Sequence, residues 1–473
     1  MAGVSRANRL PAKSAIVERA LLWALIAGLA WCPFLFGGNH LLAWGINAVL
    51  FPGLVAIYEL SLLIRGERHP VAIRQIKAPA ALFGVVMLWI FIQNATWTPD
   101  WLHHPIWQMT ADALERPIDG SISVNRDLTS LALLRLITAA SVFWIAMQLC
   151  RNASRASLLL WSIAALSCAY AVYGLLAFAL TAGRVLWIEG YSRVSVTSTF
   201  INRDSFAAYA GMGFIAICSL ILRLYRNEFA AVGGSIRFRI ATFIEVTGQK
   251  AAVLLGAAFV ILVALLLTGS RGGIASTALG LFVLGALTLR LRKQQFAERE
   301  AIIVVGALLV AATFLVFGDV VVGKITRQGF HDESRMAVYT ITIRSILDAP
   351  LLGYGYGTFA DVFPVFREQS VSTWGQWQLA HNTYLEVFQG LGILFGAMLV
   401  ASIVLLILRC VKGAMTRQEN ETIPCVAAGV AVLLGVHSLV DFSLQMQGIA
   451  ITFMALLGAG VAQSESSRLA LED

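Results

Sequence analysis

The sequence predicts an all-α polytopic membrane protein of about twelve transmembrane helices. The chain has 473 residues, of which 58% are hydrophobic and 13% charged. A soluble domain of this length cannot bury so much apolar surface in its core. Apolar runs of about twenty residues, the length that crosses the hydrocarbon core as a helix, recur along the chain. Because backbone groups in lipid must be hydrogen-bonded within their own segment, we predict helices in a single membrane domain, 1–473.

Twelve apolar runs are predicted to span the membrane. The first is too long for a signal-peptide core and no small-residue cleavage site follows it, so we expect a retained helix. The predicted spans are 15–36, 41–64, 78–95, 130–150, 157–181, 205–223, 251–268, 273–290, 301–318, 383–408, 424–440 and 446–462. Two connections, 95–129 and 319–382, are much longer than the others, and connections of that length usually carry function.

The basic residues predict an orientation. The two tails and the even-numbered connections hold 23 of the 35 Lys and Arg residues, the odd-numbered connections hold 11, and Arg135 lies inside a span. The side richer in Lys and Arg is normally cytoplasmic, so we predict both termini inside and the two long connections outside. The same asymmetry explains the net charge of +8. Nucleic acid is therefore not expected as a partner.

The longer outer connection, 319–382, contains a predicted helix that ends at a glycine-rich run. The spacing of apolar residues from Glu333 onward is helical, with one side formed by Met336, Tyr339, Ile343 and Leu347. Pro350 and the run Leu-Gly-Tyr-Gly-Tyr-Gly-Thr-Phe at 352–359 then predict the end of this helix.

Two arginines on the outer side are candidates for binding an anion. Arg203 lies in Phe-Ile-Asn-Arg-Asp-Ser-Phe before the sixth span, and Arg271 lies in Thr-Gly-Ser-Arg-Gly-Gly between the seventh and eighth spans. Charges at span edges are costly and mark function, although one arginine can also reach the headgroups or pair with a neighbour such as Asp204. At Arg271 we favour function, because the flanking Gly269, Gly272 and Gly273 would leave the backbone open to a ligand, and a guanidinium beside free backbone N–H groups suits a phosphate.

His381 is the candidate base. It opens the segment Ala-His-Asn-Thr-Tyr-Leu-Glu at the outer end of the tenth span, and helical spacing would place Tyr384 on its face. With an ordinary pKa of about 6.5, a histidine can take a proton from a hydroxyl near neutral pH. The alternative is a histidine bonded to backbone at the helix entry, with Asn382 or Thr383 as N-cap. The residues alone leave both interpretations open.

Asp441 lies at the outer end of the eleventh span, four residues after His437. It could orient His381 or hold an arginine, and the alternative is a solvated carboxylate at a helix end. His437 is predicted to be a packing residue. The sequence contains neither Asp-x-Asp nor Cys-x-x-Cys, so we expect no metal and no cofactor, and arginines would neutralise any phosphate charge.

Several of these motifs, in this order, resemble the O-antigen ligase and polymerase superfamily. They are Asn202-Arg203, Ser270-Arg-Gly-Gly273, the glycine-rich run 353–359 and His381-Asn-Thr-Tyr-Leu385, and the resemblance covers roughly 195–445. It implies a GT-C-like fold in the bacterial inner membrane, with the active site facing the periplasm. The implied donor is a glycan on undecaprenyl diphosphate, and the implied acceptor is lipid A–core, another glycan or a protein.

The resemblance also implies roles for individual residues. Arg203 and Arg271 match the arginines that hold the donor diphosphate, His381 matches the general base, and Asp441 matches a supporting acidic position. Arg335 is a further candidate contact for phosphate or sugar, with Asn202, Asn382 and Tyr384 as supporting residues. At Asp204 many relatives have an amide or another polar residue, so Asp204 could compete for Arg203.

These expectations converge on a metal-independent, inverting glycosyl transfer to an acceptor hydroxyl. One alternative is a transporter or flippase of a lipid-linked oligosaccharide, which would carry charges deep in the membrane and broken spans in matching halves. Another is a peptidoglycan-type glycosyltransferase, which shares the donor lipid but commonly uses a loop aspartate that the His381 motif does not match.

Overall fold

The computed structural model describes residues 12–181, 184–188, 194–229, 249–290, 333–371, 377–417 and 421–465. Within these ranges the chain is helical, apart from one isolated bridge between Val185 and Ile188. The α-helices are α1 (Ala12–Trp31), α2 (Leu41–Arg65), α3 (Lys77–Asn94), α4 (Ile106–Ala113), α5 (Arg126–Leu149), α6 (Ala153–Leu180), α7 (Arg203–Phe229), α9 (Gln249–Leu267), α10 (Arg271–Arg290), α12 (Glu333–Asp348), α13 (Phe359–Phe366), α14 (Thr383–Thr416), α15 (Thr422–His437) and α16 (Gln447–Ser464). Short 3-10 helices are η1 (Phe36–Gly38), η2 (Ile73–Ile76), η3 (Asp100–Leu102) and η4 (Ser443–Gln445).

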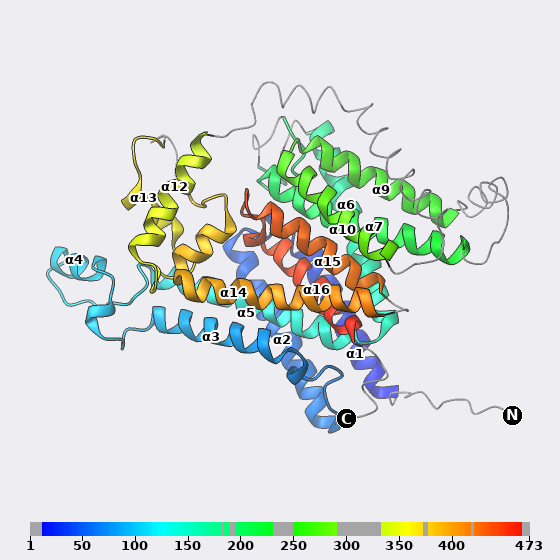
Figure 1. Cartoon of the computed structure of the whole chain (residues 1–473), viewed down its shortest axis with the longest axis horizontal. Coiled ribbons are helices and arrows are strands. Elements are labelled where there is room, and N and C mark those ends of the chain that lie inside the picture. The colour runs from blue at the N-terminus through cyan, green and yellow to red at the C-terminus, as the bar shows by residue number, and fades with distance from the viewer. Residues whose placement is uncertain are drawn as a thin grey trace.

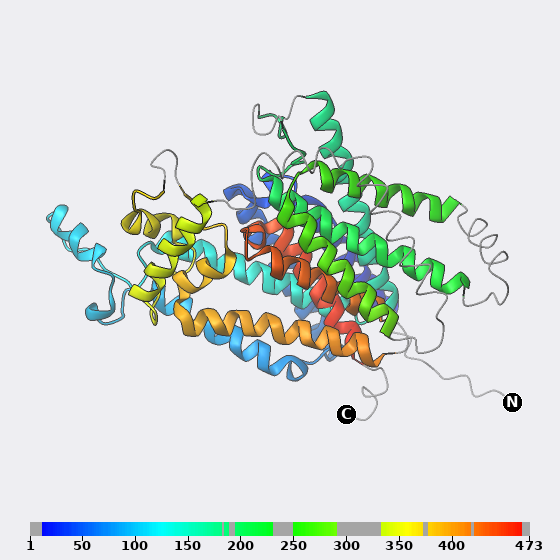
Figure 2. The ribbon, with the colours of Figure 1, turned by 45° about the horizontal axis from the view of Figure 1, so that its top comes forward.

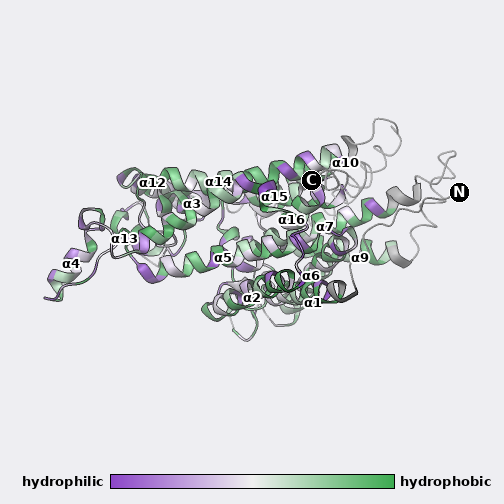
Figure 3. Cartoon of the chain, turned by 90° about the horizontal axis from the view of Figure 1, so that it is seen from below, coloured by the Kyte–Doolittle hydropathy of each residue, from purple (hydrophilic) through white to green (hydrophobic). Residues whose placement is uncertain are grey.

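Eight helical segments among the described residues are long and apolar enough to cross a membrane, and two shorter apolar helices accompany them. Figure 3 shows hydrophobic colour along most of the long helices. The chain is therefore a polytopic integral membrane protein, as predicted. The predicted span 301–318 lies outside the described residues, and each of the other predicted spans coincides with a helix. The count of twelve and the orientation stay predictions.

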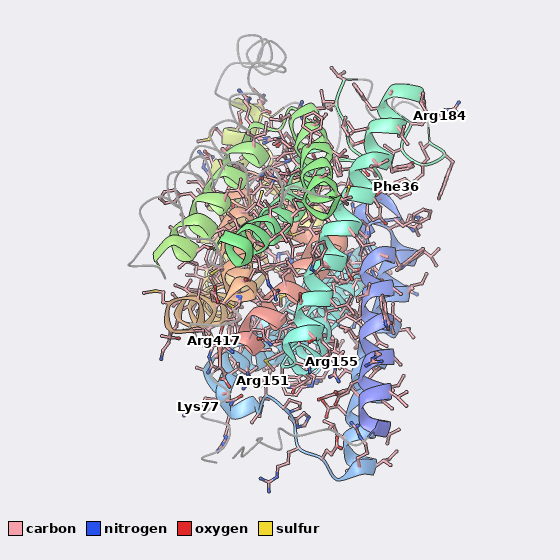
Figure 4. The ribbon with its side chains drawn as sticks, turned by 90° about the vertical axis from the view of Figure 1, so that its right-hand side faces the viewer. Phe36, Lys77, Arg151, Arg155, Arg184 and Arg417 are labelled. Carbon is pink, nitrogen blue, oxygen red and sulfur yellow. The ribbon has the colours of Figure 1, made fainter. Side chains whose placement is uncertain are left out.

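The labelled basic residues gather as the charge pattern predicts. In Figure 4, Lys77, Arg151, Arg155 and Arg417 lie near one end of the molecule, and Arg184 lies at the opposite end. The first four belong to connections that the sequence places on the same side of the membrane. Their common end supports the predicted alternation of the spans.

Helices α15 and α16 occupy the middle of the bundle, with α7 and α10 on one side and α5 on the other (Figures 1 and 2). Glycines allow these helices to approach closely. A Cβ at Gly280 of α10 would lie 2.6 Å from the carbonyl oxygen of Gly429 in α15. A Cβ at Gly458 of α16 would lie 2.4 Å from the carbonyl oxygen of Phe143 in α5. In lipid, close backbone contact of this kind supplies the packing energy between helices.

The predicted helix in the second long connection is confirmed as α12, but its buried side differs from the apolar side that the spacing suggested. Met336 and Ile343 are exposed, whereas Val338 and Ile341 are buried with Phe363 of α13. The helix has apolar residues on two sides, and the spacing alone did not select the buried one. Helices α12 and α13 lie together beside the start of α14 (Figure 1).

The sequence did not predict that α14 is broken near its outer end. Gly392 has φ +78° and ψ 166°, which separates a short first segment, 383–391, from the long remainder. The freed backbone groups are bonded elsewhere: the carbonyl oxygen of Gly390 accepts from the N–H of Gly355 at 3.0 Å and from Gln93 Nε2 at 2.8 Å. A Cβ at Gly353 would lie 2.4 Å from that same oxygen. The glycine-rich run is therefore a packing partner of the broken helix.

Candidate active site

The site begins with three helix N-termini, each closed by a side-chain cap. Asn202 caps α7, Ser270 caps α10 and Asn382 caps α14, and each side-chain oxygen accepts a first-turn N–H, at 2.7, 3.0 and 3.1 Å respectively. Arg203 and Arg271 are the first residues of α7 and α10. A helix N-terminus carries partial positive charge, so each arginine adds a full charge where an anion is already favoured.

These N-termini meet around the turn 438–442, which joins α15 to η4. Asn382 Nδ2 donates to a carbonyl of this turn at 2.9 Å, and Asn202 Nδ2 donates to Asp441 Oδ1 at 3.4 Å. On the α10 side, a Cβ at Gly272 would lie 3.1 Å from Val440. The structure thus brings the segments of Arg203, Arg271, His381 and Asp441 to one place, although they are far apart in the sequence.

Asp441 lies at the centre of these contacts and is almost fully buried. Its carboxylate is 3.7 Å from His381 Nδ1 and 3.5 Å from His437 Nε2, and it accepts a hydrogen bond from Ser443 Oγ. Burial raises the pKa of Asp441, but the neighbouring imidazoles of His381 and His437 and the hydrogen bond from Ser443 outweigh burial and hold the pKa well below the usual range. Asp441 is therefore a permanent negative charge beside two imidazoles.

His381 lies just before α14 and is not part of the helix. Its φ is +55°, so the expectation that it shares a helical face with Tyr384 is wrong. The imidazole lies against Phe442 and Trp377, with ring centroids 4.7 and 5.7 Å away, and its side chain is 24% exposed. Asn382 is the N-cap, as the alternative interpretation of this segment expected. The structure gives His381 both a helix-entry position and a carboxylate partner.

Two tyrosines fix the elements around His381. The Tyr339 hydroxyl, from α12, donates to the carbonyl oxygen of His381 at 2.8 Å. The Tyr384 hydroxyl donates to the carbonyl oxygen of Gly435 in α15 at 2.9 Å. Tyr384 therefore supports the packing of α14 on α15, and Tyr339 connects the second long connection to the candidate base.

Arg335 reaches the site from α12. Its guanidinium lies 3.6 Å from the Asp204 carboxylate and donates to the carbonyl oxygen of Val440 at 3.1 Å. The suggested competition of Asp204 for Arg203 is not seen among the described residues, because Asp204 pairs with Arg335. Arg203 itself is half-buried, and Arg271 is exposed.

The glycines after Arg271 have a different role from the expected one. We expected Gly272 and Gly273 to leave the backbone open to a ligand, but both are packed. A Cβ at Gly273 would lie 2.5 Å from the Cβ of Ala207, and one at Gly272 would lie 3.3 Å from His437 Nδ1. These glycines let α10 approach α7 and the buried histidine, and the side chain of Arg271 is left as the candidate ligand-binding group.

His437 is buried, as expected for a packing residue, and it also lies beside Asp441. It is 1% exposed, and its Nε2 lies near both Asp441 and the carbonyl oxygen of Asp204, the latter at 3.2 Å. The spacing of four residues between His437 and Asp441 was the sequence feature that could have predicted their contact. Among the described residues, no group of three metal-ligating side chains is found. The charged groups gathered here are arginines, histidines and carboxylates, which can bind an anion beside a base.

Comparison with known families gives one match to a family model. Residues 256–401 match the O-antigen ligase family model. No curated protein gives a significant match to the chain. The matched segment contains Arg271, Arg335 and His381, while Arg203 and Asp441 lie outside it and reach the same site through the contacts above. The match covers less than a third of the chain and shows similarity of this segment to that family.

Proposed function

We propose that this O-antigen ligase-like protein transfers a glycan from undecaprenyl diphosphate to an acceptor hydroxyl on the periplasmic face of the bacterial inner membrane. The observation that carries the proposal is one cluster of segments: Arg203 and Arg271 are the first residues of two capped helices whose N-terminal segments contact the turn that holds Asp441, the partner of His381. The acceptor would be the lipid A–core in a ligase, or another glycan in a polymerase.

The arginines would act on the leaving group. When the bond between the anomeric carbon and the diphosphate breaks, negative charge grows on the phosphate oxygens. Arg203 and Arg271 would stabilise this charge together with the partial positive charge of the α7 and α10 N-termini. Arg335 would contribute at the edge of the site, although part of its charge is already offset by Asp204 at 3.6 Å.

His381 would act on the acceptor. As the acceptor hydroxyl attacks the anomeric carbon from the face opposite the diphosphate, the imidazole would take its proton. Asp441, 3.7 Å from His381 Nδ1, would stabilise the imidazolium that forms. A single displacement of this kind inverts the anomeric configuration. Arginines would replace a divalent metal as the charge-neutralising groups, so transfer should survive treatment with EDTA.

The test is the variant Arg271→Ala in purified protein. Loss of one electrostatic stabiliser costs about 10²–10³ in rate, so transfer should fall by that factor while the protein still inserts and folds. Binding of radiolabelled undecaprenyl diphosphate should weaken in parallel. The matched control is Arg344→Ala, because Arg344 is an exposed arginine of α12 paired with Glu368. Normal transfer by Arg271→Ala at equal expression would contradict the proposal.

A flippase of lipid-linked oligosaccharide is the second candidate, and two observations favour it. Arg135 lies within α5, and α14 is broken at Gly392, as spans of transporters often are. Detergent-solubilised protein separates the two functions because it encloses no compartment. Formation of a new glycosidic bond from donor and acceptor in detergent supports a transferase, and its absence with flipping in vesicles supports a transporter.

A further inference from the structure

We propose that Glu386 is a positioning residue for His381, an inference that rests on the proposed function. Glu386 lies in the first turn of α14, and its two carboxylate oxygens have different partners. Oε1 accepts the backbone N–H of Ala380 at 2.6 Å, and Oε2 accepts from Gln445 Nε2 at 2.7 Å. Ala380 immediately precedes His381, so Glu386 holds the backbone from which the candidate base projects.

The backbone of His381 requires such support. A non-glycine residue with φ +55° is in a sparsely populated region and persists only where its surroundings fix it. The carbonyl oxygen of His381 is bound by Tyr339, and the preceding N–H is bound by Glu386. Hydrogen bonds on both sides of the residue thus hold the unfavourable conformation in which Nδ1 lies 3.7 Å from Asp441.

Gln445 and Arg135 hold Glu386 in turn. Gln445 belongs to η4, its side chain donates to Glu386, and its carbonyl oxygen accepts from Arg135. Arg135 also lies over the ring of Trp44, 4.6 Å from its centroid. The arginine inside the span α5 is therefore connected to the candidate base through Gln445, Glu386 and the Ala380 N–H. A charge within the membrane is costly, and these contacts explain why an arginine occupies position 135.

The contacts of Glu386 indicate a positioning role and not a role in substrate binding. Its two carboxyl oxygens are occupied by protein donors, the Ala380 N–H and Gln445 Nε2, so they are not free to bind a ligand. Removal of the carboxylate should therefore change where His381 lies and leave donor binding unchanged. A displacement of about 1 Å at a reacting group can cost about 10²-fold in rate.

The experiment compares Glu386→Ala with Glu386→Gln in purified protein. The amide oxygen of glutamine can still accept the Ala380 N–H, and its NH₂ group can donate to a flipped Gln445. We expect Glu386→Ala to lower kcat by about 10²-fold while undecaprenyl diphosphate binding is unchanged, and Glu386→Gln to restore most of the rate. The control is Glu368→Ala, which removes an exposed carboxylate from the same outer region.

A second measurement reports on the Ala380 hydrogen bond and does not depend on enzyme activity. Hydrogen exchange of the peptide that contains Ala380 should accelerate in Glu386→Ala and stay slow in Glu386→Gln, because the Ala380 N–H is bonded to the carboxylate. Wild-type transfer by Glu386→Ala, parallel loss of transfer and undecaprenyl diphosphate binding, or equal inactivity of Glu386→Gln would each overturn the inference. Full transfer by His381→Ala would instead overturn the proposed function.

Discussion

Replacing Asp441 by asparagine tests whether a fixed negative charge supports the candidate base. The substitution keeps the size of the side chain, and its amide oxygen can still accept one of the two hydrogen bonds that Asp441 accepts, from Asn202 at Oδ1 or from Ser443 at Oδ2. It removes the charge that lies 3.7 Å from His381 Nδ1. Because the imidazole becomes an imidazolium when it takes the acceptor's proton, the loss falls on the transition state and not on donor binding.

The distance between the Asp441 carboxylate and His381 Nδ1 sets the size of the expected effect on the rate. Two opposite unit charges about 4 Å apart interact by about 4 kcal/mol at an effective dielectric constant of about 20. The His381 side chain is 24% exposed, so water screens part of this energy, and we take about half of it. The remaining stabilisation of about 2 kcal/mol corresponds to about 30-fold in rate.

The assay is kcat for glycan transfer by purified protein at saturating donor, with undecaprenyl diphosphate binding measured separately. Asp361→Asn is the matched control, because Asp361 is an exposed carboxylate of α13 that accepts from Asn125 Nδ2 at 2.7 Å. We expect Asp441→Asn to lose about 30-fold in kcat with unchanged binding, and Asp361→Asn to lose nothing. A kcat within about twofold of wild type would refute the electrostatic role of Asp441.

Three further predictions concern stability and positioning. Because the pKa of Asp441 is lowered in the folded protein, its stabilising contribution is present above about pH 4 and is lost as the pH falls further; the difference in Tm between wild type and Asp441→Asn should therefore shrink as the pH falls below about pH 4, and a difference that grows over that range would contradict this. Tyr339→Phe removes one hydrogen bond to the His381 carbonyl, worth about 1 kcal/mol, so kcat should fall about fivefold without loss of undecaprenyl diphosphate binding, and an unchanged kcat would exclude this support. Gly280→Leu should greatly reduce the yield of folded protein because its Cβ would lie 2.6 Å from a backbone oxygen of α15, whereas Gly285→Leu on the same helix meets nothing within 4 Å and should express normally; equal yields would refute the packing argument.

The membrane architecture could be predicted because lipid constrains the sequence strongly. A span needs a long apolar run, and Lys and Arg mark its ends, so hydrophobicity and charge locate most helices. The break of α14 at Gly392 carried no such signal, since Leu391-Gly-Ile393 also suits a continuous apolar helix. The break depends on partners distant in the sequence, namely Gln93 and the glycine-rich run, which bond the freed carbonyl.

The sequence predicted segments that the structure brings together, but it did not predict the contacts between them. The predicted orientation placed Arg203, Arg271, His381 and Asp441 at outer span ends, and in the structure their segments lie close together. Pairings across the site depend on side-chain directions that spacing does not supply. Helical spacing therefore gave the wrong neighbour for His381, whose positive φ takes it off the helix.

The residues that match the family model form only part of the candidate site. Residues 256–401 contain the candidate base and one of the two N-terminal arginines, Arg271. They lack Asn202, which bonds to Asp441, and Asp441 itself, which lies beside the base. Removing either segment would leave His381 without its carboxylate or α7 without its link to the turn. The proposed chemistry therefore needs the assembled bundle from α7 to α16, and we predict that the matched segment alone does not transfer glycan.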